Sequence, residues 1–211
     1  MPFGGNDWLA LTTEPTSEPE MPICDPHHHF WDFRTERLPF QRYLLHELIA
    51  DIHSGHNVRS TVFIEARSMY RADGPVEMRS VGEVEFVQGL AAASASGLYG
   101  PGRAAAAIVG YADLSLGDGV APVLDVLQTA SPNRFRGIRR PVTWDPHPEI
   151  ENVRGDTREG LLANEHFRAG AWVLARRGLS FDAWLYFQQL LELADFARAI
   201  PNLTNSNSCG K

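Results

Sequence analysis

The sequence predicts a single α/β domain built on a mostly parallel sheet. Short apolar runs alternate with amphipathic segments along most of the 211 residues. Such alternation indicates parallel strands that are joined by helical crossovers. The chain is 44% hydrophobic and 21% charged, which is ordinary for a globular protein and sufficient for one sizeable core. The sheet is predicted to be either open and doubly wound or closed as a (β/α) barrel.

The chain divides into three expected parts. Residues 1–20 are rich in Pro, Glu, Thr and Ser and are expected to form a flexible arm, residues 21–204 to form the domain, and residues 205–211 to form a polar tail. Buried strands are expected at 23–25, 60–66, 103–114, 135–142 and 179–186. Helices are expected where apolar residues recur at spacings of three and four residues, in segments 43–55, 81–97, 120–131, 164–178 and 188–200.

Composition restricts the classes of partner. The net charge of −7 and the pI near 5.6 argue against a nucleic-acid or anionic membrane surface, because both require a basic face. No apolar run has the length of a membrane span, and the N-terminus lacks a secretory leader. Cys24 and Cys209 do not make a disulfide framework. We therefore predict a cytoplasmic protein whose partner is a small-molecule substrate.

Polar residues gather where the expected strands end. In α/β proteins the ligand binds at the carboxyl ends of the strands. Length alone favours an open five-stranded, flavodoxin-like sheet. However, no Gly-x-Gly-x-x-Gly or Gly-x4-Gly-Lys loop follows any expected strand, which leaves that sheet without its usual nucleotide ligand. The polar strand-end residues are Asp25, Glu65 with Arg67, Asp113, Arg139 with Arg140, and Asp182.

A run of three histidines lies at the end of the first expected strand, in "ICDPHHHFWDF". Side chains alternate along a strand, so His27 and His29 are predicted to share one face and His28 to lie on the other. Pro26 cannot donate to the sheet, so regular pairing should end near it. Neutral imidazoles suit Zn²⁺, which makes His27 and His29 candidate metal ligands. The alternative is a solvated histidine cluster on a loop.

Two strand-end residues are candidates for catalysis. Glu65 ends an apolar strand and could be a metal ligand or a general base, or only the ion-pair partner of Arg67. Arg139 shares a strand face with Gly137, whose small size should leave room for a guanidinium group that grips a carboxylate or a lactone carbonyl. Of Arg139 and Arg140, one is expected to be solvated.

Asp182 is the third candidate. An acid inside an apolar strand is costly unless it is hydrogen-bonded or lies near a cation, so Asp182 is predicted either to function in the site or to be paired structurally. The remaining histidines lie in helix or loop segments and are expected at the surface or in packing, namely His46, His53, His56, His147 and His166.

The histidine segment resembles the first-strand signature of the amidohydrolase-related TIM-barrel hydrolases. It is most similar to the branch with fuconolactonase-like and 2-pyrone-4,6-dicarboxylate lactonase-like enzymes, in which Asp-x-His-x-His is followed by an aromatic pair. Here these positions are Asp25, His27, His29, Phe30 and Trp31. The resemblance implies a metal-dependent hydrolase that acts on a lactone or a similar cyclic ester or amide. It implies zinc first, with manganese or a metal-free mechanism as alternatives.

The resemblance extends from Asp7 to Thr204, through "TVFIEARSMYRADGP", "FRGIRR" and "LSFDAWLY". Members of the family continue through sixth, seventh and eighth strands, which supply a further His and an Asp. Here "ARAIPNLT" is followed only by "NSNSCGK", and a complete barrel needs about 250 residues. We therefore expect an incomplete (β/α) barrel of about five of the eight βα units, truncated at its C-terminus. Open sheet edges should favour self-association. The functional alternative is a non-catalytic remnant of such an enzyme.

Overall fold

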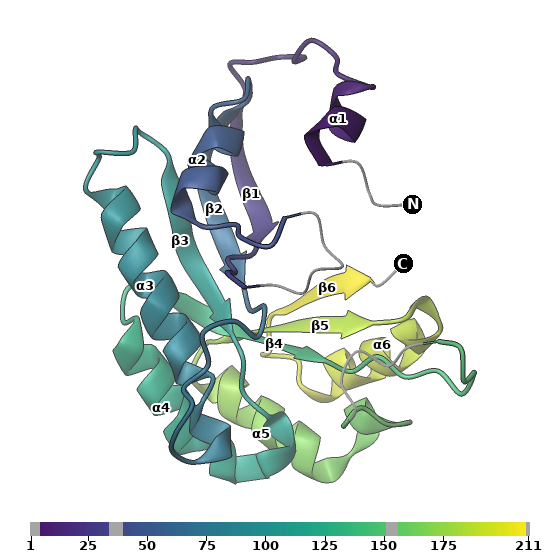
Figure 1. Cartoon of the computed structure of the whole chain (residues 1–211). Helices are drawn as coiled ribbons and strands as arrows, with labels where there is room; N and C mark the ends of the chain where they lie inside the picture. Colours follow the sequence, from purple (N-terminus) through teal and green to yellow (C-terminus); the bar gives the residue numbers. More distant parts are fainter. Residues whose placement is uncertain (1–4, 34–39, 151–155, 210–211) are drawn as a thin grey trace.

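The computed structural model describes residues 5–33, 40–150 and 156–209, and its centre is one curved parallel sheet (Figure 1). Every neighbouring pair of strands is parallel, and the strands are arranged in the order of the sequence. The strands are β1 (Pro22–His28), β2 (Asn57–Ile64), β3 (Arg103–Gly110), β4 (Phe135–Pro141), β5 (Ser180–Leu185) and β6 (Asn205–Cys209).

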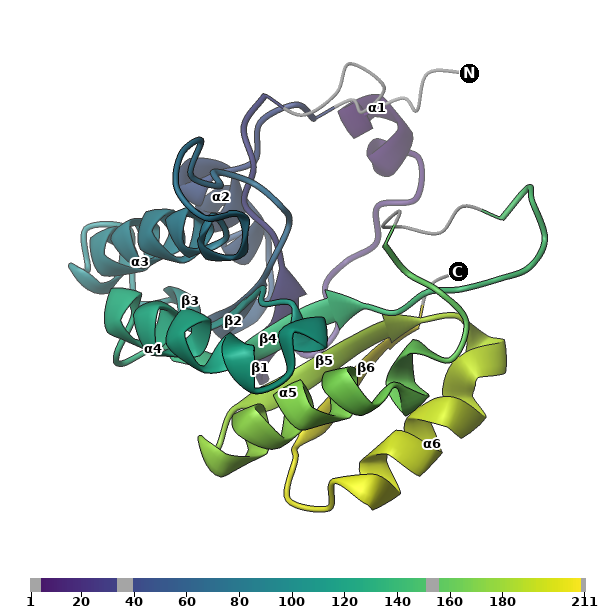
Figure 2. The same ribbon diagram turned by 90° about the horizontal axis from the view of Figure 1, so that it is seen from below.

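Helices follow the strands and cover the outer side of the curved sheet, as Figure 2 shows for α3 to α6. The α-helices are α1 (Gly5–Ala10), α2 (Leu45–Ile52), α3 (Val81–Ala95), α4 (Ala121–Ala130), α5 (Glu165–Arg176) and α6 (Leu190–Ala199). Short 3-10 helices are η1 (Val76–Met78), η2 (Leu114–Val120), η3 (Leu161–Ala163) and η4 (Phe187–Gln189). Among the described residues, no helix is both long and apolar enough to span a membrane.

The strand order distinguishes between the two predicted architectures. A flavodoxin-like open sheet has the order 2-1-3-4-5 because its chain winds in both directions from the first strand. Here the order is sequential, and the sheet curls with α3 to α6 on its outer side (Figure 2). The α/β class and the incomplete (β/α) barrel are thus confirmed, and the open-sheet alternative is wrong.

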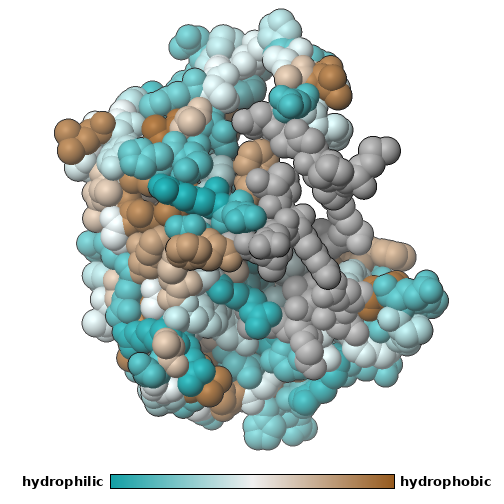
Figure 3. All heavy atoms as spheres, viewed as in Figure 1, coloured by the Kyte–Doolittle hydropathy of each residue, from teal (hydrophilic) through white to brown (hydrophobic). Residues whose placement is uncertain are grey.

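The hydrophobic core lies between the sheet and its helices. Phe63, Ile108, Ile138 and Phe181 come from four neighbouring strands and are fully buried in this layer. The outer surface is mixed, and in the view of Figure 3 hydrophilic areas separate small hydrophobic ones. Alternation along each strand therefore assigns one set of side chains to the core and leaves the next set for the concave face.

Gly137 of β4 lies against the backbone of the neighbouring strand. A Cβ atom at this position would lie 2.3 Å from the backbone oxygen of Ser180, on the neighbouring strand β5. The absence of a side chain thus permits the close approach of β4 and β5.

The last segment differs from its predicted form. Residues 205–209, expected as part of a polar tail, form the parallel strand β6, whose register with β5 runs from Phe181↔Asn205 to Leu185↔Cys209. Strand addition uses main-chain N–H and C=O groups, which a polar sequence also provides. The predicted arm at residues 1–20 contains α1, and residues 1–4, 210 and 211 lie outside the described part of the chain.

Candidate active site

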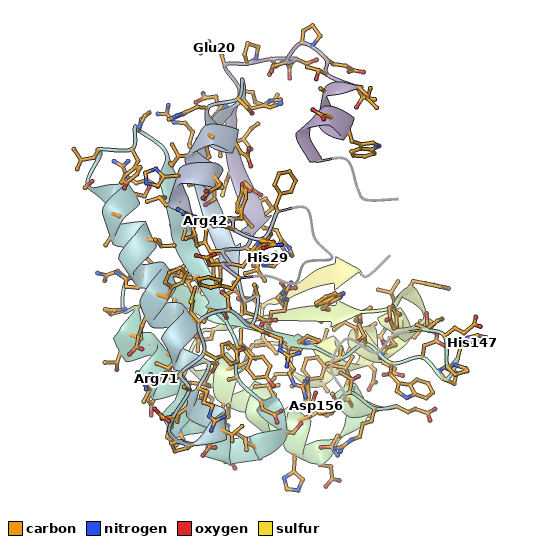
Figure 4. The ribbon with its side chains drawn as sticks, in the orientation of Figure 1. Glu20, His29, Arg42, Arg71, His147 and Asp156 are labelled. Carbon is orange, nitrogen blue, oxygen red and sulfur yellow. The ribbon has the colours of Figure 1, made fainter. Side chains whose placement is uncertain are left out.

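The candidate site is centred on two histidine rings at the exit of β1. The Nε2 atoms of His27 and His29 lie 3.2 Å apart, and the two rings meet edge to face with their centroids 4.8 Å apart. His28 lies on the opposite face, buried against Phe30 and Phe63. The predicted alternation is therefore present in the structure, and it brings two imidazoles together on the concave side of the sheet. Figure 4 shows His29 there, between the ends of β1 and β2 and the group β4 to β6.

The local sequence explains how β1 delivers this pair. Pro26 has no N–H group, and the register of β1 on β2 shifts between Asp25 and His28. The carboxylate of Asp25 accepts a hydrogen bond of 3.1 Å from the backbone N–H of His27. Pairing nevertheless continues to His28, which lies opposite Phe63. Regular pairing thus ends near Pro26, as predicted, although the strand itself continues to His28.

A backbone carbonyl fixes the tautomer of His29. Nδ1 of His29 lies 2.8 Å from the carbonyl oxygen of Ile64, at the end of β2. Because a carbonyl oxygen can only accept, Nδ1 carries the proton and donates it, and Nε2 of the neutral ring presents a lone pair toward His27. This is the arrangement in which an imidazole binds a metal through one nitrogen while a second interaction orients the ring.

Both rings are held in the neutral form. Burial lowers the pKa of His29 to about 3, with a further lowering by the charge of Arg139, although the hydrogen bond to Ile64 opposes the shift. Burial and the charge of Arg139 also lower the pKa of His27, while Asp25 acts in the opposite direction. At neutral pH both rings are therefore uncharged, which is the state from which an imidazole nitrogen can ligate a metal.

Arg139 and Glu65 form a buried ion pair beside the histidines. Nε of Arg139 donates to Oε1 of Glu65 at 3.2 Å, and its NH2 group donates to the backbone oxygen of the same residue. Side-chain exposure is 6% for Arg139 and 2% for Glu65. NH1 of Arg139 lies 3.5 Å from Nε2 of His27, and the guanidinium carbon lies 5.0 Å from the ring centroid of Trp184. Glu65 therefore pairs with Arg139 from β4, and not with its sequence neighbour Arg67.

The two arginines of β4 lie on opposite faces, and both are buried. Arg140 is 1% exposed and contacts Asp156 at 2.6 Å and Asp113 at 3.5 Å. The expectation that one of the two is solvated is wrong, because the loops after β3 and β4 cover the Arg140 side chain with these partners. Asp182 is also buried and lies directly across from Arg139 in the register of β4 and β5.

A pocket of about 400 Å³ opens beside the histidines, between β1 and α2. Its polar side includes a hydrogen bond of 2.5 Å from the hydroxyl of Tyr43 to Asp51. Burial and the neighbouring Asp51 raise the pKa of Tyr43, so its hydroxyl stays protonated. The ten lining residues are Asp25, His27, His28, His29, Trp31, Tyr43, Leu48, Asp51, Ile52 and Val58.

Three residues in or near the site were not identified from the sequence, namely Tyr43, Asp51 and Glu83. Tyr43 and Asp51 are separated from the histidine run in sequence. The backbone bridge between Trp31 and Tyr43 brings Tyr43 to the site, and Asp51 follows in α2. Glu83, which is fully buried in α3, could have been found, because it falls on the same helical face as Val84 and Val87. The five other histidines are exposed, and Figure 4 shows His147 far from His29.

The histidine pair fits two positions of a zinc centre. Two nitrogens bound to a tetrahedral zinc at about 2.0–2.1 Å lie roughly 3.3–3.4 Å apart. The separation here is 3.2 Å. Within residues 5–33, 40–150 and 156–209, no group of three or more His, Cys, Asp or Glu side chains is arranged to hold a metal. Catalytic zinc sites use three protein ligands, so such a centre would need a third ligand in addition to His27 and His29.

Comparison with known proteins gives one curated relative and several solved structures. No family model matches the chain. The uncharacterized protein y4mH of Sinorhizobium fredii (strain NBRC 101917 / NGR234) is 29% identical over 202 residues, which cover 87% of this chain and 60% of that protein.

The structural matches include amidohydrolases from two bacteria. A Burkholderia multivorans amidohydrolase matches in two crystal structures. The structure with bound HEPES has a TM-score of 0.57 and 18% identity, over 85% of this chain and 54% of that one. The structure with bound zinc has a TM-score of 0.58 and 20% identity, over 87% of this chain and 56% of that one. Amidohydrolase 2 from Bifidobacterium longum subsp. infantis matches with a TM-score of 0.50 and 17% identity, over 88% of this chain and 60% of that one. At these identities the chain shares the fold of amidohydrolases, and it spans 54–60% of the length of the proteins it matches.

Proposed function

We propose that the protein is a hydrolase of the amidohydrolase type, which opens a lactone or a similar cyclic ester or amide beside His27 and His29. The observation that carries this proposal is the 3.2 Å approach of the two Nε2 atoms, with His29 anchored on the carbonyl of Ile64. Both imidazoles are neutral, as a metal-binding pair requires. The amidohydrolase fold and the zinc in one Burkholderia structure support the same assignment.

A divalent metal, zinc first and manganese second, would be held by His27 and His29 with further ligands from outside the described residues. Such a metal polarises a carbonyl group and lowers the pKa of bound water toward neutrality. His29 keeps its orientation through Ile64. NH1 of Arg139, which faces His27, would bind the carbonyl oxygen or a carboxylate of the substrate.

Glu65 and Asp182 are assigned to the same concave face as Arg139. Glu65 accepts from the guanidinium group through its carboxylate and its backbone oxygen, which supports a role in aiming Arg139. A metal ligand or a general base, our first expectation for Glu65, would need this carboxylate to leave Arg139. Asp182, across the sheet from Arg139, would act as an acid or as a second support for the guanidinium group.

The position of Arg139 also favours a second mechanism, without a metal. Its NH1 group is 3.5 Å from Nε2 of His27, where a positive charge opposes a metal cation. In this mechanism Arg139 polarises the substrate carbonyl, and neutral His27 accepts a proton from the attacking water. The two mechanisms use the same residues and differ in their response to chelation.

The double variant His27→Ala/His29→Ala tests the proposed function. We expect it to lose hydrolysis of a lactone panel and binding of Zn²⁺, while its far-UV circular dichroism stays that of the parent. His147→Ala, at an exposed histidine, is the matched control and should change neither property. Unchanged turnover in the double variant would remove the pair from the mechanism. Turnover that survives metal stripping would identify the metal-free mechanism, and no turnover on any lactone would favour the non-catalytic remnant.

Self-association through the outer strands is a separate proposal. β1 and β6 are the outer strands of the described sheet, and an outer strand offers backbone groups for pairing with another chain. We expect the 211-residue chain to elute as oligomers in size-exclusion chromatography with light scattering and to bind the dye ANS. A monomer near 23.4 kDa with one cooperative melting transition would contradict this proposal.

A further inference from the structure

Glu83 is a fully buried acid on α3 that contacts the loop between β2 and α3. Its Oε1 atom accepts hydrogen bonds from the backbone N–H groups of Ala66, at 3.0 Å, and Ser68, at 2.7 Å. Its Oε2 atom is buried without a hydrogen-bond partner among the described residues. Burying a carboxyl group costs free energy that its hydrogen bonds must offset. Both backbone hydrogen bonds of Glu83 go to the same loop, which suggests that holding this loop is its role.

The loop is held in a constrained conformation against α3. Arg67 and Met69 have φ angles of 59° and 54°, a left-handed region that non-glycine residues keep only where the surroundings impose it. A Cβ atom at Gly82, the neighbour of Glu83, would lie 2.6 Å from the backbone oxygen of Met69. The loop therefore lies directly on the first turn of α3, where the Glu83 carboxyl group holds it.

The same loop connects to both sides of His29. The hydroxyl of Ser68 donates to the backbone oxygen of Phe30, the residue after His29, at 2.8 Å. Ile64, two residues before Ala66, provides the carbonyl that accepts from Nδ1 of His29. Glu83 thus bonds the segment that lies between the two anchors of this histidine.

We propose that Glu83 is a positioning residue for the candidate site: its carboxyl group fixes the loop after β2 and, through Ile64 and Ser68, sets the ring orientation of His29. It touches neither substrate nor metal. The inference rests on the proposed function to the extent that His29 is a ligand there. Removal of a residue that orients a metal-ligating histidine without itself binding the metal typically weakens metal affinity by about 10- to 100-fold.

The role requires an acceptor and not a negative charge. Burial, and secondly the nearby carboxylate of Glu65, raise the pKa of Glu83 to about 8, while the bonds from Ala66 and Ser68 oppose the shift. Glu65 is itself paired with Arg139, which offsets part of its charge. The raised pKa favours the neutral form of Glu83, and a glutamine side chain keeps its shape, a neutral state and the Oε1 acceptor.

The experiment compares Glu83→Gln and Glu83→Leu in the full chain with Val87→Ala, a buried apolar position of α3 one turn beyond Glu83. Two quantities are measured: the Kd for Zn²⁺ by competition with a chromogenic chelator, and the ¹⁵N shifts of the His29 ring without metal. We expect Glu83→Gln to keep the Nδ1–H tautomer and a Kd within about twofold of the parent. Glu83→Leu should lose the single tautomer and weaken zinc binding by about tenfold or more.

The control separates positioning from general destabilisation. Val87→Ala should lower Tm without changing either the tautomer or the Kd, and equal changes in Val87→Ala would overturn the inference. Parental tautomer and affinity in Glu83→Leu would overturn it as well.

Two further outcomes keep the test decisive. If Glu83→Leu does not fold, Ser68→Ala, which removes only the bond to Phe30, must broaden the tautomer signal, and an unaltered signal counts against the proposal. If the parent binds no zinc, the metal-dependent function fails while the tautomer measurement still decides the role of Glu83.

Discussion

The two faces of the sheet differ in what they bury. The outer face buries fully apolar side chains such as Phe63 and Phe181 under the helices. The concave face carries His27, His29 and Arg139, whose strand neighbours point to the outer face. The apolar majority of the outer face stabilises the fold, with His28 and Arg140 as its buried polar exceptions, so the concave set can hold a cluster of polar groups.

Arg139 and Arg140 show this difference within two consecutive residues. Arg139, toward the concave side, pairs with Glu65, whose side chain is 2% exposed. Arg140, toward the helices, pairs with Asp113 and Asp156, whose side chains are 33% and 53% exposed. The partners of Arg140 can be hydrated if the arginine is removed, and the partner of Arg139 cannot.

The largest effect is expected for Arg139→Met. This change leaves the Glu65 carboxylate buried without its cation, which costs about 3–5 kcal/mol of unfolding free energy. Urea denaturation measures the loss. The double variant Glu65→Gln/Arg139→Met should recover most of it, because no buried charge remains. A double variant no more stable than Arg139→Met would show that the ion pair is not the cause.

The second largest effect is expected for acidification, which should lower the free energy of unfolding through His28, on the outer face of β1. Burial lowers the pKa of His28 to about 4 from 6.5, and both of its ring nitrogens are without a hydrogen-bond partner among the described residues. The unfolded chain therefore binds this proton more readily than the folded chain. The contribution to stability is complete above pH 6.5 and is lost as the pH falls toward 4, by up to about 3 kcal/mol.

His28→Phe should flatten this acid limb, as measured by unfolding free energy between pH 4 and 8. His27 and His29 also have lowered pKa values and act in the same direction, so part of the slope should remain. A slope identical to that of the parent would mean that His28 is not protonated on unfolding in this range.

A smaller loss is expected for Arg140→Met, the matched counterpart of Arg139→Met. The variant loses charge-assisted hydrogen bonds worth about 1–3 kcal/mol, but its acidic partners gain water. The same urea titration gives the comparison. A loss as large as that of Arg139→Met would break the proposed difference between the two faces.

The fold was predictable because it depends on local pattern. Each of the five predicted strands and helices is present, since periods of two and near 3.6 directly reflect which side chains face the core. β6 was missed because its pairing with β5 uses backbone groups that leave no trace in the residue types of 205–209.

The site was predictable only in part. Alternation was enough to place His27 and His29 together, and the strand ends were enough to put Glu65 and Arg139 on one side of the sheet. Their partners were not predictable, because the ion pair joins residues 74 positions apart. For the same reason, sequence proximity suggested Arg67 as the partner of Glu65. Contacts of this kind depend on the curvature of the whole sheet, which no local pattern encodes.

The smallest effect is expected for Trp184→Leu, which sharpens the comparison at one contact of the concave face. The guanidinium carbon of Arg139 lies 5.0 Å from the centroid of this ring, within the range of a cation–π interaction worth about 0.5–2 kcal/mol. Trp184→Leu should therefore lower the unfolding free energy by about 1 kcal/mol in the parent. In the Glu65→Gln/Arg139→Met background the same change should cost less, because no cation remains over the ring. Equal costs in both backgrounds, measured as a double-mutant cycle, would show that Trp184 contributes packing alone and that Arg139 is held by Glu65 without it.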